Sequence, residues 1–295
     1  MCRLKSGIIL KDRVYIPDHD GHQEMLAELK IEDTRENAER LFVRAELYPR
    51  DNDIFTDPDT WIYRVEQDIL PDWYVAEADE ARMREAVKTW YAAHVHIGED
   101  NLTVNGGRHW IKGGQNISIC GNATVKRICG NATVKYISDN ATVEGICDNV
   151  TVEFICGNAT VEGIYDNATV KRICDNATVK YISDNATVEG ICDNVTVEFI
   201  WDNATVKYIR GNATVKRICG NATVKRICGN ATVKRISDNA TVEDISDNAT
   251  VIISGVMEWA NTDKAVVQDN ALIIDRYRKQ IIHSGNFALK KSGEE

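Results

Sequence analysis

The chain of 295 residues has few prolines, four in all, and each of them lies before residue 72. It contains no apolar run close to the roughly 20 residues that a membrane-spanning helix needs, and the segment Met1–Gly7 lacks the apolar stretch of a secretory signal. It also lacks a glycine-rich phosphate loop, a nucleophile elbow and a kinase signature. These absences argue against a membrane protein and against the common enzyme classes, and we expect a cytoplasmic protein.

The composition is that of a folded protein, because 43% of the residues are hydrophobic and 27% are charged. The net charge of −10 is uneven along the chain: residues 1–96 hold 21 acidic and 13 basic side chains, and the remainder is nearly balanced. This region also holds all four prolines. We therefore predict that residues 1–96 form a separate, small, acidic α+β domain, which is long enough to fold.

A nine-residue repeat fills the chain from Ile119 to about Val251. Its form is Ile-x-(Gly/Asp)-Asn-Ala-Thr-Val-(Lys/Glu)-x, and its asparagine recurs every ninth residue from Asn122 to Asn248, fifteen times. Nine residues are too few to enclose side chains, so we expect two repeats, or 18 residues, per coil, with one short strand on each of two sides. The predicted fold is mainly β, a parallel β-solenoid, right-handed by the usual preference of parallel crossovers.

Strand alternation predicts which positions of each repeat lie inside the solenoid. Ala123, Val125 and Ile128 should point inward, with a bend where three residues separate valine from isoleucine. Thr124 and Lys126 should point outward. The Gly-Asn or Asp-Asn pair fits a corner, because these residues tolerate left-handed backbone. Stacked asparagines would hydrogen bond along the solenoid as a ladder. The first members of this predicted ladder are Asn122, Asn131, Asn140, Asn149 and Asn158.

Degenerate copies of the repeat flank the regular region and indicate where the caps lie. Asn101–Val104 is such a copy before it, and Asp269–Ile273 is another after it, both out of register. The predicted order of parts is the domain of residues 1–96, an N-terminal cap or first coil over 97–118, the solenoid over 119–253, and C-terminal coils and cap over 254–295.

A duplication within the repeats bears on function. Residues 122–155 and 167–200 are identical except at one position. Their offset of 45 residues equals two and a half coils, so the second copy should lie on the opposite side of the solenoid. The aromatic pair of the first copy, Tyr136 and Phe154, should therefore face away from its counterpart. A shaped catalytic pocket would not survive this transfer, which argues against catalysis in the solenoid.

Charge is banded along the repeats. Six acidic residues and no basic residue lie between Lys135 and Lys171, and no acidic residue lies between Lys207 and Arg235. We predict that this second, basic band binds an anionic partner, which would be nucleic acid, an acidic protein or the acidic domain of another copy. Its residues are Lys207, Arg210, Lys216, Arg217, Lys225, Arg226, Lys234 and Arg235.

Eight of the nine cysteines occupy one repeat position, directly after the isoleucine. Trp201 and Arg210 fill the same position elsewhere, so it should lie at a corner or face solvent. Cys156, Cys174 and Cys192 would form one column with a spacing within disulfide range. In a cytoplasmic protein free thiols are expected.

Patterns in the first 96 residues predict a hairpin over Gly7–Pro17, a short helix over Gly21–Ile31, strands over Leu41–Tyr48 and Thr60–Asp68, and a helix over Glu77–His94. The apolar stripe predicted for the last helix is Ala81, Ala86, Val87, Trp90 and Tyr91.

Two groups of histidines in this domain could bind a divalent metal. One is the sequence Asp18-His19-Asp20-Gly21-His22, and the other is His94 with His96. Neither has a complete set of ligands, and a polar turn after Pro17 with ordinary surface histidines explains them better. We predict no metal site, no cofactor and no catalytic residue.

The Asp-Asn-Ala-Thr-Val units resemble the nonapeptide repeats of phage and bacterial β-solenoid proteins. The segments Gly7–Pro17 and Asp68–Trp73 look like a domain found ahead of such repeats. The resemblance covers most of the chain. It implies a β-solenoid behind a small N-terminal domain and, through its phage members, a structural, assembly or host-interference role in the host cytoplasm.

We expect a non-enzymatic scaffold or binding protein that acts through a protein partner or through self-association into a homo-oligomer, without contact to a membrane. One alternative is a phage inhibitor of a host defence or nucleic-acid enzyme, in which the acidic domain enters a basic cleft or the basic band contacts nucleic acid. Another is a small enzymatic or metal-binding activity of the N-terminal domain.

Overall fold

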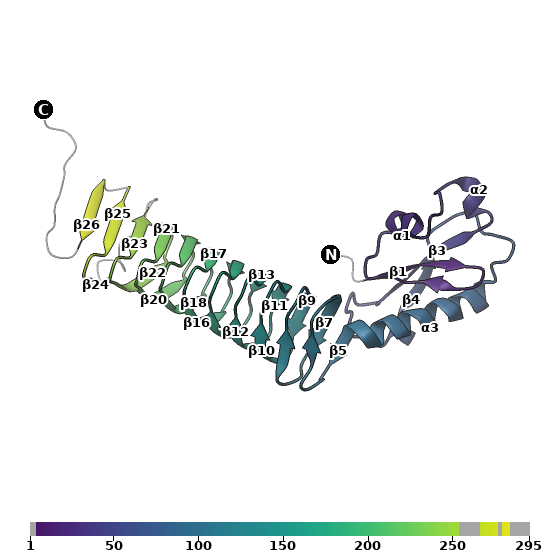
Figure 1. The fold of residues 1–295 in the computed structure, drawn as a ribbon, viewed down its shortest axis with the longest axis horizontal. Coiled ribbons are helices and arrows are strands. Elements are labelled where there is room, and N and C mark those ends of the chain that lie inside the picture. The colour runs from purple at the N-terminus through teal and green to yellow at the C-terminus, as the bar shows by residue number, and fades with distance from the viewer. Residues whose placement is uncertain (1–3, 254–265, 277–278, 284–295) are drawn as a thin grey trace, which may run out of the picture. The chain divides into compact units, whose positions relative to one another are not determined.

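The computed structural model describes residues 4–253, 266–276 and 279–283. The chain divides into two compact units, Met1–His96 and Ile97–Glu295, and each is described by itself (Figure 1).

The first unit is built on a four-strand antiparallel sheet with the order β2-β1-β3-β4. Its strands are β1 Lys5–Leu10, β2 Val14–Tyr15, β3 Phe42–Tyr48 and β4 Ile62–Val65. Its helices are α1 His22–Glu28, α2 Arg35–Ala38, the 3-10 turn η1 Pro58–Thr60, and α3 Ala76–His94. The predicted hairpin, strands and helices are confirmed, whereas α2 and η1 were too short to give a periodic signal.

Helices α1 and α3 cover opposite faces of this sheet (Figure 1). Alternation along β1 explains the arrangement, because Ile8 packs in a cluster with Met25 of α1, while Gly7 comes close to Met83 of α3. The buried face of α3 is Met83, Val87 and Trp90. The predicted stripe was therefore wrong at Ala81, which is exposed, and it missed Met83.

A buried ammonium group joins the segment after β2 to β1. Lys5 is fully buried, and its Nζ donates to Asp20 Oδ1 at 2.8 Å and to the carbonyl of His19 at 2.9 Å. The Nζ atom also lies 4.8 Å from the centre of the Trp90 ring. Because a buried charge without partners is costly, these contacts hold the His19–Asp20 turn in place.

The second unit is a parallel β-solenoid in which each 18-residue coil places one strand in each of two sheets (Figure 1). The ten-strand sheet contains β6 Thr103–Val104, β8 Ile117–Ile119, β10 Thr133–Ile137, β12 Thr151–Ile155, β14 Thr169–Ile173, β16 Thr187–Ile191, β18 Thr205–Ile209, β20 Thr223–Ile227, β22 Thr241–Ile245 and β24 Val266–Val267. The twelve-strand sheet contains β5 Val95–Ile97, β7 Arg108–Lys112, β9 Thr124–Cys129, β11 Thr142–Ile146, β13 Thr160–Ile164, β15 Thr178–Ile182, β17 Thr196–Ile200, β19 Thr214–Ile218, β21 Thr232–Ile236, β23 Thr250–Ile253, β25 Leu272–Asp275 and β26 Gln280–His283. The predicted fold class and coil length are confirmed.

Identical residues stack along the interior. Ala123, Val125 and Ile128 are fully buried, and their counterparts in the following coils form the same three rows in one continuous core. Thr124 and Lys126 are partly exposed, so the predicted alternation is confirmed. Two outward positions separate each valine from the next isoleucine. The strand therefore departs from strict alternation at this point, where the three-residue step predicted a bend.

The corners are fixed by backbone conformation and by two hydrogen-bond ladders. The residue before each asparagine is glycine or aspartate in the left-handed region, as at Gly157 with φ of +66° and Asp175 with φ of +59°. An aspartate at this position can add a hydrogen bond to the corner one coil earlier, as where Asp175 Oδ2 accepts the N–H of Gly157 at 2.9 Å. The asparagine amides form the second ladder, in which Asn140 donates to Asn122 at 3.4 Å and Asn158 donates to Asn140 at 3.3 Å. Asn149 donates to Asn131 in the same way at 3.3 Å.

The ends of the solenoid continue both sheets. Strands β6 and β7 lie within the segment 97–118, for which a first coil was predicted, and β8 begins in it and ends at Ile119. Much of the predicted C-terminal part, 254–295, lies outside the described residues. In the portion that is described, β25 pairs in parallel with β23, and β26 then pairs with β25 in the antiparallel direction.

Candidate functional site: a notch in a column of planar side chains

Each repeat sends two side chains outward between its valine and its isoleucine. The first is Lys or Glu in almost every repeat, and the second is usually a planar group. On the ten-strand sheet, the second position forms a column along the solenoid. Its members in order are Tyr136, Phe154, Arg172, Gly190, Tyr208, Arg226 and Asp244.

The first three planar groups in this column stack on one another. The rings of Tyr136 and Phe154 are 5.6 Å apart with an interplanar angle of 17°, and the Arg172 guanidinium carbon lies 5.9 Å from the Phe154 ring centre. On the twelve-strand sheet, Tyr181 and Phe199 stack at the same 5.6 Å. The duplicated aromatic pairs thus lie in different sheets, as the half-integral offset predicted.

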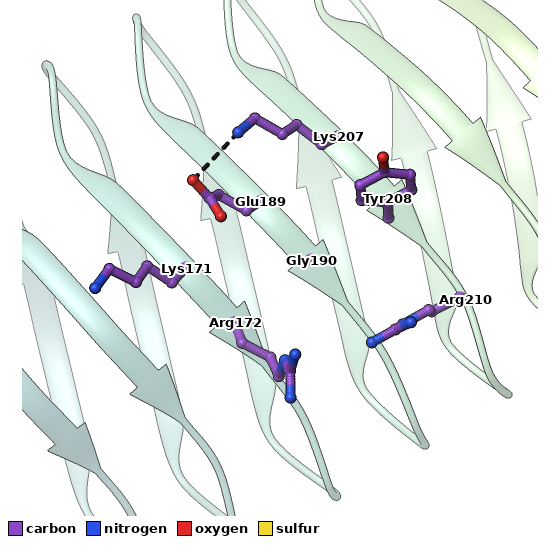
Figure 2. A pocket seen from close by; sticks show the side chains of 7 residues that line it. All are labelled: Lys171, Arg172, Glu189, Gly190, Lys207, Tyr208 and Arg210. Carbon is purple, nitrogen blue, oxygen red and sulfur yellow. Dashed lines mark hydrogen bonds and ion pairs between the residues drawn. The ribbon is translucent and has the colours of Figure 1, made fainter.

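The column is interrupted at Gly190. A cavity of about 340 Å³ lies there, between Arg172 in the preceding coil and Tyr208 in the following one (Figure 2). A Cβ atom placed on Gly190 would come no closer than 3.8 Å to any neighbour, so the space above this strand is open. Tyr208 is 49% exposed and, within residues 4–253, stacks on no other ring. We call this cavity the Gly190 notch.

Cationic groups surround the Gly190 notch, and two of them lack an acidic partner. Lys207 pairs with Glu189 at 3.2 Å, and Lys171 pairs with a glutamate one coil earlier. Arg172 and Arg210 form no ion pair with any described residue, and Figure 2 shows both side chains extending toward the corner below Gly190. The notch therefore carries two positive charges that form no ion pair with a described residue.

The equivalent place in the first copy of the duplication is filled. Tyr165 folds back over two strands of the twelve-strand sheet, so a Cβ on Gly145 would lie 2.2 Å from its Oη, and one on Gly163 would lie 2.9 Å from its ring. In the second copy, Arg210 stands where the first has Tyr165, and Tyr208 stands where the first has Gly163. The two copies diverge immediately after the identical segments, and that divergence is the sequence signal that identifies the notch.

The predicted basic band is divided between the two sheets. Because one coil is 18 residues long, bases nine residues apart in sequence lie on opposite sides. The ten-strand side carries Lys207, Arg210, Lys225 and Arg226, and the twelve-strand side carries Lys216, Arg217, Lys234 and Arg235.

Ion pairs between neighbouring coils neutralise part of that band. Lys216 pairs with Glu198 at 2.6 Å and Arg226 pairs with Asp244 at 3.0 Å. Lys126 and Glu144 form the same kind of pair nearer the N-terminal end. Residues that form bands of one charge in the sequence thus lie, in part, next to residues of the opposite charge along the folded solenoid. Of the predicted band residues, only Lys207 and Arg210 line the notch.

The cysteines lie at corners, and those described are free thiols. Cys156, Cys174 and Cys192 form the expected column. Burial raises the pKa of all three thiols, to about 12 for Cys174, where neighbouring Asp175 adds to the effect. Because the thiolate is the reactive form, these residues are poor nucleophiles at neutral pH.

Two corner groups bring a thiol and two carboxylates within 4.8 Å of one another. They are Cys147 with Asp148 and Asp166, and Cys174 with Asp175 and Asp193. In each group, one aspartate already accepts the backbone N–H of the other, at 3.2 and 3.3 Å. These groups therefore follow from the corner hydrogen bonding of the repeat.

The histidines singled out in the N-terminal domain have separate partners. His19 Nε2 lies 3.1 Å from Glu28, and His94 Nε2 lies 3.3 Å from Asp18. His22 Nε2 lies 3.4 Å from the carbonyl of Ala45. In the part of this domain that is described, they converge on no common point with a third ligand.

His22 makes the stability of this domain depend on pH. Burial lowers its pKa below the usual 6.5, so the unfolded chain takes up the proton first and stability is lost as pH falls from 7 to 5. We expect His22→Gln to lose less stability than the wild type over this interval, and to differ from it by a constant amount above pH 7. Urea unfolding of the full chain, followed by tryptophan fluorescence, measures both. Equal pH dependence of the two proteins would contradict the prediction.

No family model matches the chain, and no curated protein or solved structure is detectably similar to it. Among the described residues, no helix is both long and apolar enough to cross a bilayer.

Proposed function

We propose that the protein is a non-enzymatic binding protein whose solenoid offers the same surface on two opposite sides to a protein partner or to further copies of the chain. The observation that carries this proposal is the duplicated aromatic pair. Tyr136 with Phe154 and Tyr181 with Phe199 have equal ring spacings, and a lysine lies over each tyrosine ring, at 5.7 and 5.0 Å.

The same local environment occurs in both sheets, which supports a contact surface that is used twice. Tyr136 is 40% exposed, and aromatic rings with a polar edge are favoured in protein interfaces. The resemblance to phage solenoid proteins adds the expectation that the partner is a host protein met in the host cytoplasm.

Light scattering over a wide concentration range tests the self-association form of the proposal. We expect the double variant Tyr136→Ser with Phe154→Ser, and separately Tyr181→Ser with Phe199→Ser, to stop association at pairs of chains. The combined quadruple variant should remain a monomer.

Photo-crosslinking from positions 136 and 181 tests the form that involves another protein, and both positions should capture the same partner. The proposal is overturned if the chain neither associates with itself nor captures a shared partner. It is also overturned if the chain turns over a small molecule and one substitution abolishes that turnover.

A further inference from the structure

Beyond that binding role, we propose that the Gly190 notch binds a nucleoside phosphate. Its ring takes the place left free in the column above Gly190, and its phosphate lies between the guanidinium groups of Arg172 and Arg210.

The spacing of the column accommodates a ring. Arg172 and Tyr208 lie on strands two positions apart, and neighbouring strands are separated by about 4.8 Å. A ring above Gly190 would therefore lie about 4.8 Å from each side, within the range of roughly 4.5–7 Å found for stacked groups. Guanidinium and phenol groups both stack on aromatic rings. The neighbouring Tyr136 and Phe154 rings already stack at 5.6 Å in the same column.

The protein itself covers the equivalent place with a tyrosine side chain in its first copy. There the Tyr165 ring lies over Gly163 and its hydroxyl end reaches Gly145, so the sheet surface accepts an aromatic side chain beside these two glycines. In the second copy the corner residue is Arg210, which supplies charge in place of a ring. A ligand that supplies the missing ring and neutralises this positive charge must be both aromatic and anionic.

The charge of the notch favours phosphate as the anion. In the first copy, the arginine equivalent to Arg172 is Arg127, and its Nε donates to Cys147 Sγ at 3.1 Å. Arg172 has no such hydrogen bond to a described residue, and Arg210 extends toward the same corner (Figure 2). Two guanidinium groups match the charge of about −1.5 to −2 on a phosphate monoester, to which arginine can donate two hydrogen bonds.

One further group distinguishes a nucleoside from other aromatic phosphates. The carboxylate of Glu189, held by Lys207, also lines the notch. A carboxylate only accepts hydrogen bonds, so it suits a sugar hydroxyl or a base amino group and disfavours a second anion. The volume of about 340 Å³ lies at the lower end of the range for small-molecule sites, which fits a single nucleotide.

Titration calorimetry on the full chain at low ionic strength tests the proposal, with AMP, adenosine, inorganic phosphate and phosphotyrosine as probes. AMP should bind more tightly than each of the other three. Arg172→Ala and Arg210→Ala should each weaken AMP binding about tenfold or more, because each removes a charge-assisted contact. The matched control is Arg276→Ala, an exposed arginine that follows β25 of the other sheet and lies outside the basic band, and it should leave AMP binding unchanged.

Gly190→Phe fills the notch without removing a charge and should abolish AMP binding. Phenylalanine already occupies this column at Phe154, so the variant should fold, and circular dichroism checks this. The proposal is overturned if AMP does not bind, if phosphate alone binds as tightly, or if phosphotyrosine binds more tightly. It is also overturned if either arginine variant binds AMP like the wild type.

Discussion

The substitution Val161→Asp should unfold the coils around it and lower the free energy of unfolding by more than about 4 kcal/mol. Val161 is fully buried on β13, in the valine row between Val143 and Val179. The row offers no polar group to a carboxylate, so the new side chain must stay unpaired or become protonated. Both outcomes are costly in an apolar interior.

The adjacent residue provides a matched control. Thr160 is exposed on the same strand, so Thr160→Asp adds the same charge to solvent and should change stability by less than about 0.5 kcal/mol. Val161→Thr keeps the shape and buries only a hydroxyl, and it should cost about 1–3 kcal/mol if Val161→Asp cannot be purified. Urea unfolding followed by far-ultraviolet circular dichroism measures all three. Equal unfolding midpoints for Val161→Thr and Thr160→Asp would show that the valine row is not the core.

The contrast between positions 160 and 161 is also why the fold could be predicted from the sequence. A period of nine residues leaves one arrangement in which Ala123, Val125 and Ile128 are all buried, and every later repeat repeats that constraint. The corner could also be predicted from the sequence, because glycine and aspartate both tolerate left-handed backbone. In the N-terminal domain, by contrast, one-turn elements such as α2 left no period to detect.

The Gly190 notch could not be predicted in the same way. It depends on neighbours 18 residues away along the column, such as Arg172 and Tyr208, and on a corner side chain that reaches toward it. The prediction of a basic band from neighbouring charges in the sequence therefore grouped Lys207 with Lys216, although the two residues lie on opposite sides of the solenoid. The size of each outward side chain, and not its polarity, decides where this surface is open.

A second large effect is expected at the corner of Gly157. Its φ of +66° is strained for a β-branched residue, and a Cβ atom there would lie 2.9 Å from the backbone nitrogen of Asp139. Gly157→Val should therefore lower the free energy of unfolding by about 1–3 kcal/mol. Urea unfolding at neutral pH measures the change.

Gly157→Asp is the decisive companion to that variant, because it adds a side chain to the same backbone but follows the rule of the repeat. Asp175, one coil later in the same column, has φ of +59°, and its Oδ2 accepts the N–H of Gly157 at 2.9 Å. A carboxylate introduced at position 157 could accept the N–H of Asp139 in the same way, which offsets the close approach. We expect this variant to stay within about 1 kcal/mol of the wild type. If valine were tolerated as well as aspartate, neither the left-handed corner nor its carboxylate ladder would explain why only glycine and aspartate occupy this position in all fifteen repeats.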